Sequence, residues 1–185
     1  MPRPITNFGL PEGCSSKTIA ESNRINKLIE AREDFVSETF SKVAEAKAAP
    51  ANDALIDTAN DIRKRRVASV QSEIKIRQTI IDFLSGPVPK DLRRICDESH
   101  AKIAEVEADL RTKYEAMGLS SKVGSRGFID NVFFMRHPRH QDARMASDEA
   151  VDHFQRIQPA INVHVNEIAE LQGQLQAMKE KMLAP

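Results

Sequence analysis

The sequence lacks tryptophan and has one tyrosine, and aromatic residues make up only 5% of its 185 residues. A compact mixed α/β enzyme of this size usually has a more aromatic core, whereas long helices pack well through Ile, Leu, Val, Met and Ala. Hydrophobic residues still reach 41% of the chain, which is ample for a core. The composition therefore favours an elongated, all-helical protein over a compact enzyme.

Cysteine and long apolar runs are scarce as well. Cys14 and Cys96 are isolated thiols without CxxC spacing, as is typical of a reducing compartment, and Cys96 on an apolar helix face is most simply a core residue. The start MPRPITNFGLPEG has no apolar core of the kind a secretory signal needs, and no apolar run approaches the length of a membrane span. We therefore expect a cytoplasmic protein, or one built into an assembly in the cytoplasm, with no membrane span.

No sign of charge dominates, because 27 basic residues balance 27 acidic ones. This balance argues against binding of a polyanion by the whole chain. Catalytic motifs are also missing: we find no Walker sequence, no GxGxxG and no nucleophile elbow. A di-iron bundle needs Glu-x-x-His on two helices, and only Asp97-x-x-His100 approximates it. We predict a non-enzymatic protein with no catalytic residue, cofactor or metal site, and a redox or metal enzyme is a remote alternative.

Proline, glycine and capping residues divide the chain into helices. A capping-box pattern at Thr18 and Glu21 predicts a helix over 18–48, which Pro50 ends. A second helix reaches Leu84, where the sequence SGPVP ends it, and Pro89 suits the first turn of a third helix that continues to Met117.

The predicted fold is all-α: an elongated bundle of about four long helices with coiled-coil-like packing, in which short turns make neighbours antiparallel. It has an extended N-terminal arm rich in proline and glycine, a three-helix antiparallel region, an irregular apolar and basic loop, and a C-terminal coiled-coil helix. These parts are residues 1–16, 17–117, 118–146 and 147–185.

The apolar stripes predict which faces are buried. In the first helix the inner face is widened by Leu28, Phe35 and Phe40, and in the second Arg77 interrupts the stripe. Pro159 must kink or restart the last helix, but the heptad phase is the same on both sides of it, which favours one kinked helix.

The last helix carries the best heptad register of the chain, with one polar member, His164. The seam could pack within the chain or against a copy of the chain, and it consists of Phe154, Ile157, Ile161, His164, Ile168, Leu171, Leu175, Met178 and Met182. His164 has three interpretations: a hydrogen-bonded core histidine, a residue that specifies register, or a metal ligand or pH switch. The hydrogen-bonded core histidine is favoured, and a metal ligand is disfavoured because no metal-ligating partners stand at suitable spacing.

The segment 118–146 is too long for an ordinary connection in a small helical protein, so it is either functional or an assembly element. Its apolar residues either cap the bundle or anchor a neighbouring subunit. They are Phe128, Ile129, Val132, Phe133, Phe134 and Met135. The HxxH spacing of His137 and His140 is a poor metal site because arginines surround it. Those arginines suit either phosphate contact or ion pairs with helix first turns, and they are Arg136, Arg139 and Arg144.

One other basic run stands out, "RKRR" at Arg63, Lys64, Arg65 and Arg66. On a helix these residues spread around the circumference, so a solvated face is the simplest interpretation and nucleic-acid contact the alternative. The leading functional hypothesis is a structural or adaptor protein that assembles with itself or with other proteins, as in a virion-like, secretion or scaffold complex. The second is a nucleic-acid-associated protein that contacts the phosphate backbone through residues 63–66 and 136–144.

Overall fold

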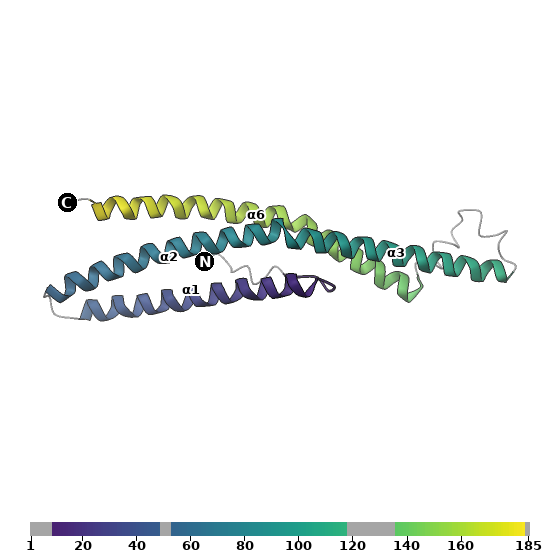
Figure 1. Cartoon of the computed structure of the whole chain (residues 1–185), viewed down its shortest axis with the longest axis horizontal. Coiled ribbons are helices and arrows are strands. Elements are labelled where there is room, and N and C mark those ends of the chain that lie inside the picture. The colour runs from purple at the N-terminus through teal and green to yellow at the C-terminus, as the bar shows by residue number, and fades with distance from the viewer. Residues whose placement is uncertain (1–8, 49–52, 118–135, 184–185) are drawn as a thin grey trace.

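The computed structural model describes residues 9–48, 53–117 and 136–183, and the secondary structure within these ranges is entirely α-helical. Four helices follow one another in these ranges: α1 (Ser16–Ala48), α2 (Asp53–Ser85), α3 (Pro87–Ala116) and α6 (Pro138–Leu183). The 46 residues of α6 extend over about 69 Å at 1.5 Å per residue. The molecule is accordingly elongated, as the composition predicts (Figure 1).

α2 and α3 lie end to end instead of side by side, which corrects the antiparallel three-helix region predicted for 17–117 (Figure 1). Gly86 is the only residue between them, and an antiparallel helix hairpin needs a loop of roughly two to five residues. Pro87 restarts the helix at once, because the fixed φ of proline suits the first turn. The SGPVP sequence therefore marks a joint within one rod. Within residues 16–116 the chain reverses direction once, between α1 and α2, and α6 then runs back antiparallel to α3 and α2 (Figure 1).

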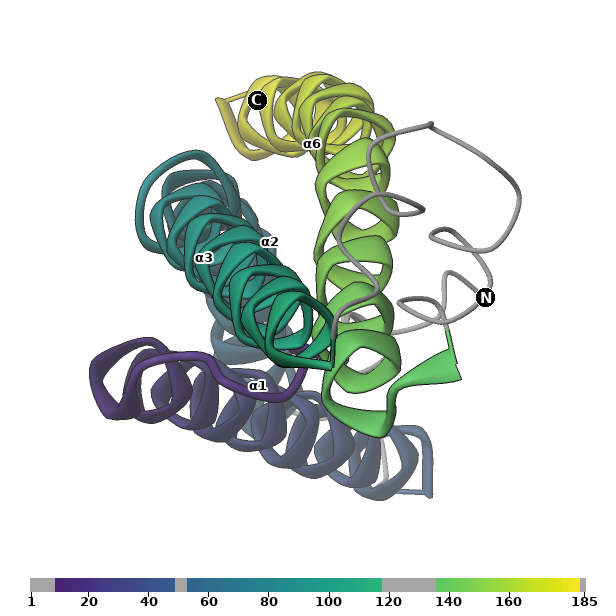
Figure 2. The same ribbon diagram turned by 90° about the vertical axis from the view of Figure 1, so that its right-hand side faces the viewer.

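The other two helices pack against this α2–α3 rod. α6 packs on both α3 and α2, whereas α1 packs mainly on α2. Seen from the end, α1 and α6 lie on opposite sides of the rod (Figure 2). In the described part of the chain, α3 therefore lies beside one helix, α6, whereas α2 lies beside two, α1 and α6. The sequence predicted a bundle of about four helices.

The buried core is concentrated where α2 meets α3. Ile80, Leu84, Val88 and Leu92 are the largest side chains that are fully buried, and all four lie within two turns of the joint at Gly86. The same cluster contains one residue of α1 and two of α6, together with three more of α2 and α3: Ile25, Ala150, Ile157, Ile76, Phe83 and Ile95. Helices that are far apart in sequence thus share one core near the middle of the rod.

The start of α1 is capped by Ser15, three residues before the predicted Thr18. The Thr18 backbone N–H donates to Ser15 Oγ at 3.3 Å, and the Ser15 N–H donates to Asp91 Oδ2 of α3 at 2.7 Å. Burial raises the pKa of the Asp91 carboxyl, but hydrogen bonds from Thr18 and Ser15 and the nearby Arg94 guanidinium outweigh it and lower that pKa. A carboxylate from another helix thus takes the role that the capping box assigned to Glu21, which pairs with Arg24 instead.

The described part of the predicted N-terminal arm, residues 9–15, is not helical but packs on the chain's own core. Leu10 and Cys14 lie against the core cluster, and Arg94 donates a hydrogen bond to the Gly13 carbonyl at 2.6 Å. Gly13 has φ +92°, a conformation that side chains rarely adopt, and it lies close to Ile95. Residues 9–15 are therefore part of the fold rather than a free arm for a neighbour.

α6 begins at Pro138, nine residues before the predicted start, which corrects the boundary of the irregular segment 118–146. The His137 carbonyl accepts hydrogen bonds from the backbone N–H groups of His140 and Gln141, so the first turn forms around a proline at its first position. The buried face here is small and polar, with His140, Ala143 and Ser147. Its 3–4 spacing continues the heptad seam, but it lacks the large apolar residues by which a helix is recognised in sequence. Farther along, the helix continues through Pro159 without interruption, as predicted.

Candidate functional site

The residues of the α6 seam differ in how deeply they are buried along the helix. At its N-terminal end Ala143, Ser147 and Ala150 are buried against the α2–α3 rod, and farther along Ile157 and His164 are buried as well. Phe154, predicted in the same seam, is instead 42% exposed, with Arg93 over its ring. Beyond His164 the seam residues are only half-buried: Ile168, Leu171, Leu175 and Met178. The C-terminal half of α6 thus presents an apolar stripe that its own chain covers in part.

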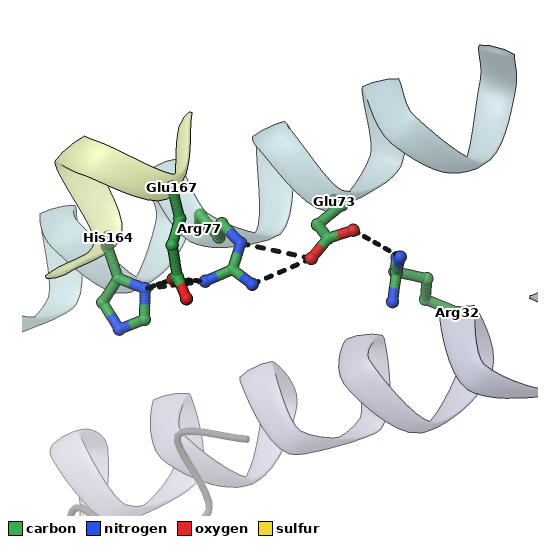
Figure 3. A network of polar contacts seen from close by, with 5 residues as sticks. All are labelled: Arg32, Glu73, Arg77, His164 and Glu167. Carbon is green, nitrogen blue, oxygen red and sulfur yellow. Dashed lines mark hydrogen bonds and ion pairs between the residues drawn. The ribbon is translucent and has the colours of Figure 1, made fainter. Parts of the chain in front are cut away.

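A polar network crosses the three helices at the point where this change occurs. Arg77 of α2 is its centre: its Nη2 donates to Glu73 Oε1 at 2.8 Å, and its Nη1 donates to His164 Nδ1 at 3.2 Å and to Glu167. Arg32 of α1 donates to the other carboxylate oxygen of Glu73 (Figure 3). The side chains of Arg77 and Glu73 are only 13% and 19% exposed, so these charges are largely removed from water.

The network balances two arginines with two glutamates and keeps His164 neutral. An arginine N–H can only donate, so Nδ1 of His164 must accept and its ring proton sits on Nε2. Burial and the positive charge of Arg77 lower the pKa of His164 from its ordinary value of 6.5, and the Glu167 carboxylate only partly opposes them. His164 is therefore a hydrogen-bonded core histidine, which agrees with the favoured interpretation of the sequence.

Next to the network, a groove runs between the three helices, with a volume of about 480 Å³. One wall belongs to α1 and the other to the C-terminal half of α6, and α2 forms the floor. Apolar residues dominate both walls, among them Phe40, which is 69% exposed although the sequence predicted it on the inner face. The lining residues that carry the argument below are Val36, Phe40, Val43, Leu171, Gln174 and Met178. An apolar groove of this length is suited to the side of another helix.

The structure brings part of the predicted seam to this groove. Leu171 and Met178 line it, and His164 contacts the network at its end. Ile161 packs against the core, and Ile168 and Leu175 are half-buried. The predicted apolar anchor residues Phe128, Ile129, Val132, Phe133, Phe134 and Met135 lie outside the described residues.

The two basic runs lie on opposite halves of the rod, because residues 63–66 belong to the first part of α2 and residues 136–144 to the region where α6 begins (Figure 1). Arg65 pairs with Asp61 and Glu38 and stacks over Phe35, whereas Arg63, Lys64 and Arg66 are exposed. At the other end, Arg136, Arg139 and Arg144 are exposed, and Arg144 lies 3.8 Å from Asp148. The runs do not form one continuous basic surface.

Sequence reasoning missed most of the network and one wall of the groove. In the sequence Arg77 appeared only as an interruption of an apolar stripe, and Glu167 was not singled out. A sequence signal did exist. Arg32, Glu73 and Arg77 are charged residues that stand where the 3–4 spacing of α1 and α2 expects an apolar residue, on helices that must pack together. A buried charge needs a partner, so each of them predicts a carboxylate or an arginine on a neighbouring helix.

In the described part of the chain, no group of three or more His, Cys, Asp or Glu side chains is placed to hold a metal ion. His140 instead lies 3.4 Å from Glu107 of α3. Comparisons with protein-family models, curated proteins and solved structures find no match. Within the described ranges, no helix combines the length and the apolar character that crossing a membrane requires.

Acidification is expected to destabilise the fold through His164. The pKa of His164 in the folded state lies below the ordinary value of 6.5, so the fold has the full stabilisation by neutral His164 above pH 6.5. This stabilisation is lost progressively as the pH falls from 6.5 through the folded-state pKa. Urea unfolding between pH 8 and pH 5 measures this, with His164→Gln as the control because glutamine keeps an acceptor for Arg77 but does not titrate. Parallel pH profiles for the two proteins would contradict the prediction.

Proposed function

We propose that the chain is a non-enzymatic structural or adaptor protein that assembles through its helices, and that the groove between α1, α2 and α6 is its binding surface. The observation that carries the proposal is the exposed apolar lining of this groove, with Phe40 at 69% exposure on one wall and half-buried Leu171 and Met178 on the other. A helix that filled the groove would cover these side chains and give α6 the coiled-coil packing that its heptads favour.

The shape and charge of the groove suit a protein partner better than a small ligand or a nucleic acid. Its walls are open along the helices, and of its three charged lining residues Arg32 and Glu73 already pair with each other, which leaves the exposed Arg66 as a single positive charge. A nucleic acid would need a continuous positive surface, but the two basic runs are separated along the rod. An amphipathic helix needs what the groove offers, namely apolar contact along several turns.

Phe40→Glu is the variant that tests the proposal. We expect it to weaken assembly by about 2 kcal/mol, or roughly thirtyfold, because an interface aromatic is replaced by a charge that must be desolvated. Folding stability should change by less than about 0.5 kcal/mol, because Phe40 is mostly exposed. Light scattering after gel filtration measures assembly, and circular dichroism measures helix content.

Val163→Glu is the matched control, because Val163 is an apolar residue with 52% exposure that does not line the groove. Equal assembly of wild type and Phe40→Glu would refute the groove as the binding surface. The ratio of absorbance at 260 and 280 nm in the same run tests the alternative function, since co-purified nucleic acid would raise it.

A further inference from the structure

We propose that residues 160–183 of α6 (the distal segment) swing away from α2 when His164 gains a proton, with Pro159 as the hinge. The proposal goes beyond the proposed function and does not depend on what the groove binds. Three features carry it: the position of the proline, the shallow burial of the distal segment, and the balance of charge around His164. Release of the distal segment would remove one wall of the groove.

Pro159 separates two parts of α6 that are held very differently. On its N-terminal side, Ala143, Ala150 and Ile157 are buried against the α2–α3 rod. Proline has no N–H to donate to the carbonyl one turn earlier, so the helix lacks a backbone hydrogen bond at this point and bends there most easily. Pro159 is also exposed, so its ring makes no buried contact that bending would break. α6 can therefore pivot at Pro159 while residues 138–157 stay docked.

The polar network is the main attachment of the distal segment to α2. Among the residues of this segment whose side chains are described, only His164 is buried. The apolar seam residues beside it stabilise less, because hydrophobic stabilisation follows the area removed from water and they are only half-buried: Ile161, Ile168, Leu171, Leu175 and Met178. His164 and Glu167 both reach Arg77 of α2 (Figure 3). A change in the network therefore decides whether the distal segment stays on α2.

The charges around His164 balance only while its ring is neutral. The charged groups that face it come from the three helices packed there, and they are two cations and two anions: Arg32 of α1, Glu73 and Arg77 of α2, and Glu167 of α6 (Figure 3). A proton on Nδ1 turns the acceptor for Arg77 into a donor, and an arginine N–H can only donate. The Glu167 carboxylate, 3.5 Å from Nδ1, cannot neutralise both cations. One positive charge is then uncompensated until the distal segment moves into water.

The direction of the pH response follows from the same contacts. Burial and the positive charge of Arg77 lower the pKa of His164 from 6.5 in the docked state, whereas the released ring lies in water and takes up its proton near the ordinary value. Docking of the distal segment is therefore most favourable above pH 6.5 and weakens as the pH falls through the lowered pKa. Acid opens the distal segment.

Native-state hydrogen exchange of the full-length chain, followed by mass spectrometry at pH 8 and pH 5 and corrected for the intrinsic rate at each pH, tests the switch. We expect the distal segment to open at least about threefold more often at pH 5. Low concentrations of urea should change this opening little, because a local opening exposes little surface. His164→Gln should remove the response, since glutamine accepts from Arg77 without titrating. His153→Gln is the matched control and should keep it, because His153 Nδ1 lies 2.9 Å from the Glu149 carbonyl oxygen of its own helix, outside the network.

Glu167→Gln produces the same excess of positive charge without a proton. It leaves Arg32 and Arg77 with the carboxylate of Glu73 alone, so the distal segment of this variant should open more often than that of the wild type already at pH 8. Glu170→Gln is its control, because Glu170 is an exposed carboxylate of the same segment outside the network. Circular dichroism of each variant at both pH values excludes loss of fold as the cause.

Three results would overturn the inference. The first is equal opening of the wild-type distal segment at pH 8 and pH 5. The second is exchange of this segment only together with the core and with the same urea dependence, which would show global unfolding. The third is a His164→Gln chain that still responds to pH. All three leave the proposed function standing, because Phe40→Glu tests the groove separately.

Discussion

Leu92→Ala is expected to lower the free energy of unfolding by about 3–4 kcal/mol, the range for emptying a buried leucine site. Leu92 has 0% exposure and lies beside Val88 and Leu84, where α2, α3, α1 and α6 share one core. The surrounding helices are held by several partners each, so they cannot close the cavity by a small movement. Urea unfolding followed by circular dichroism measures the loss.

The matched control is Leu110→Ala in the distal part of the same helix. Leu110 is half-buried in the part of α3 where α6 is the only other helix among the described residues, so the same chemical change should cost about 1 kcal/mol. Hydrogen exchange should likewise be slowest around Leu92 and faster towards the C-terminal end of α3, because local stability follows local packing. Equal losses at both positions would show that the core is spread evenly along the rod.

The helices themselves were predictable because local signals determine where each one starts and ends. The positions of proline and glycine predicted the ends of α1, α2 and α3 to within a few residues, and the 3–4 spacing of apolar residues predicted most of α6. The end-to-end placement of α2 and α3 was not predictable in this way. A sequence such as SGPVP fits both a reversal and a joint, and packing against α6 across Gly86 decides between them.

The concentration of the core at that joint also depends on tertiary structure. The apolar stripes continue along the full length of each helix, and nothing in their spacing distinguishes Leu92 from Leu110. The two differ only in how many helices surround them, which depends on where α1 ends and how far α6 extends. For the same reason Phe40 appeared to be an inner residue, although it is 69% exposed in the described part of the chain.

Arg77→Met is the second change with a large expected effect. We expect the free energy of unfolding to fall by about 3 kcal/mol, because removing one partner from a buried ion pair leaves the other charge uncompensated. Here Glu73 and Glu167 would both remain on the inner side of the helices, with 19% and 22% exposure. Arg32 would still pair with Glu73, but Glu167 would have only the neutral His164, at 3.5 Å, beside it among the described residues. Arg156→Met is the control, since the 64% exposed Arg156 pairs with Asp152 at the surface and its loss should cost less than about 1 kcal/mol.

Removing the whole network should be far less harmful than removing its centre. A chain with Arg32→Met, Glu73→Gln, Arg77→Met and Glu167→Gln is expected to unfold within about 1 kcal/mol of the wild type, because a neutral set buries no unpaired charge. If this chain is as unstable as Arg77→Met alone, the ion pairs themselves supply the stability.

We expect the network to fix the register of α6 on α2 instead. Sliding α6 by one heptad would put Ala160 or Gln174 in the place of Glu167, and Ile157 or Leu171 in the place of His164. None of these residues carries a negative charge, so a shift by one heptad leaves Arg32 and Arg77 to share the single carboxylate of Glu73 and one buried positive charge uncompensated. The apolar seam alone does not discriminate, because it repeats every seven residues. Disulfide cross-linking of cysteines introduced at exposed positions of α2 and α6 would then show one register in the wild type and several in the neutral chain.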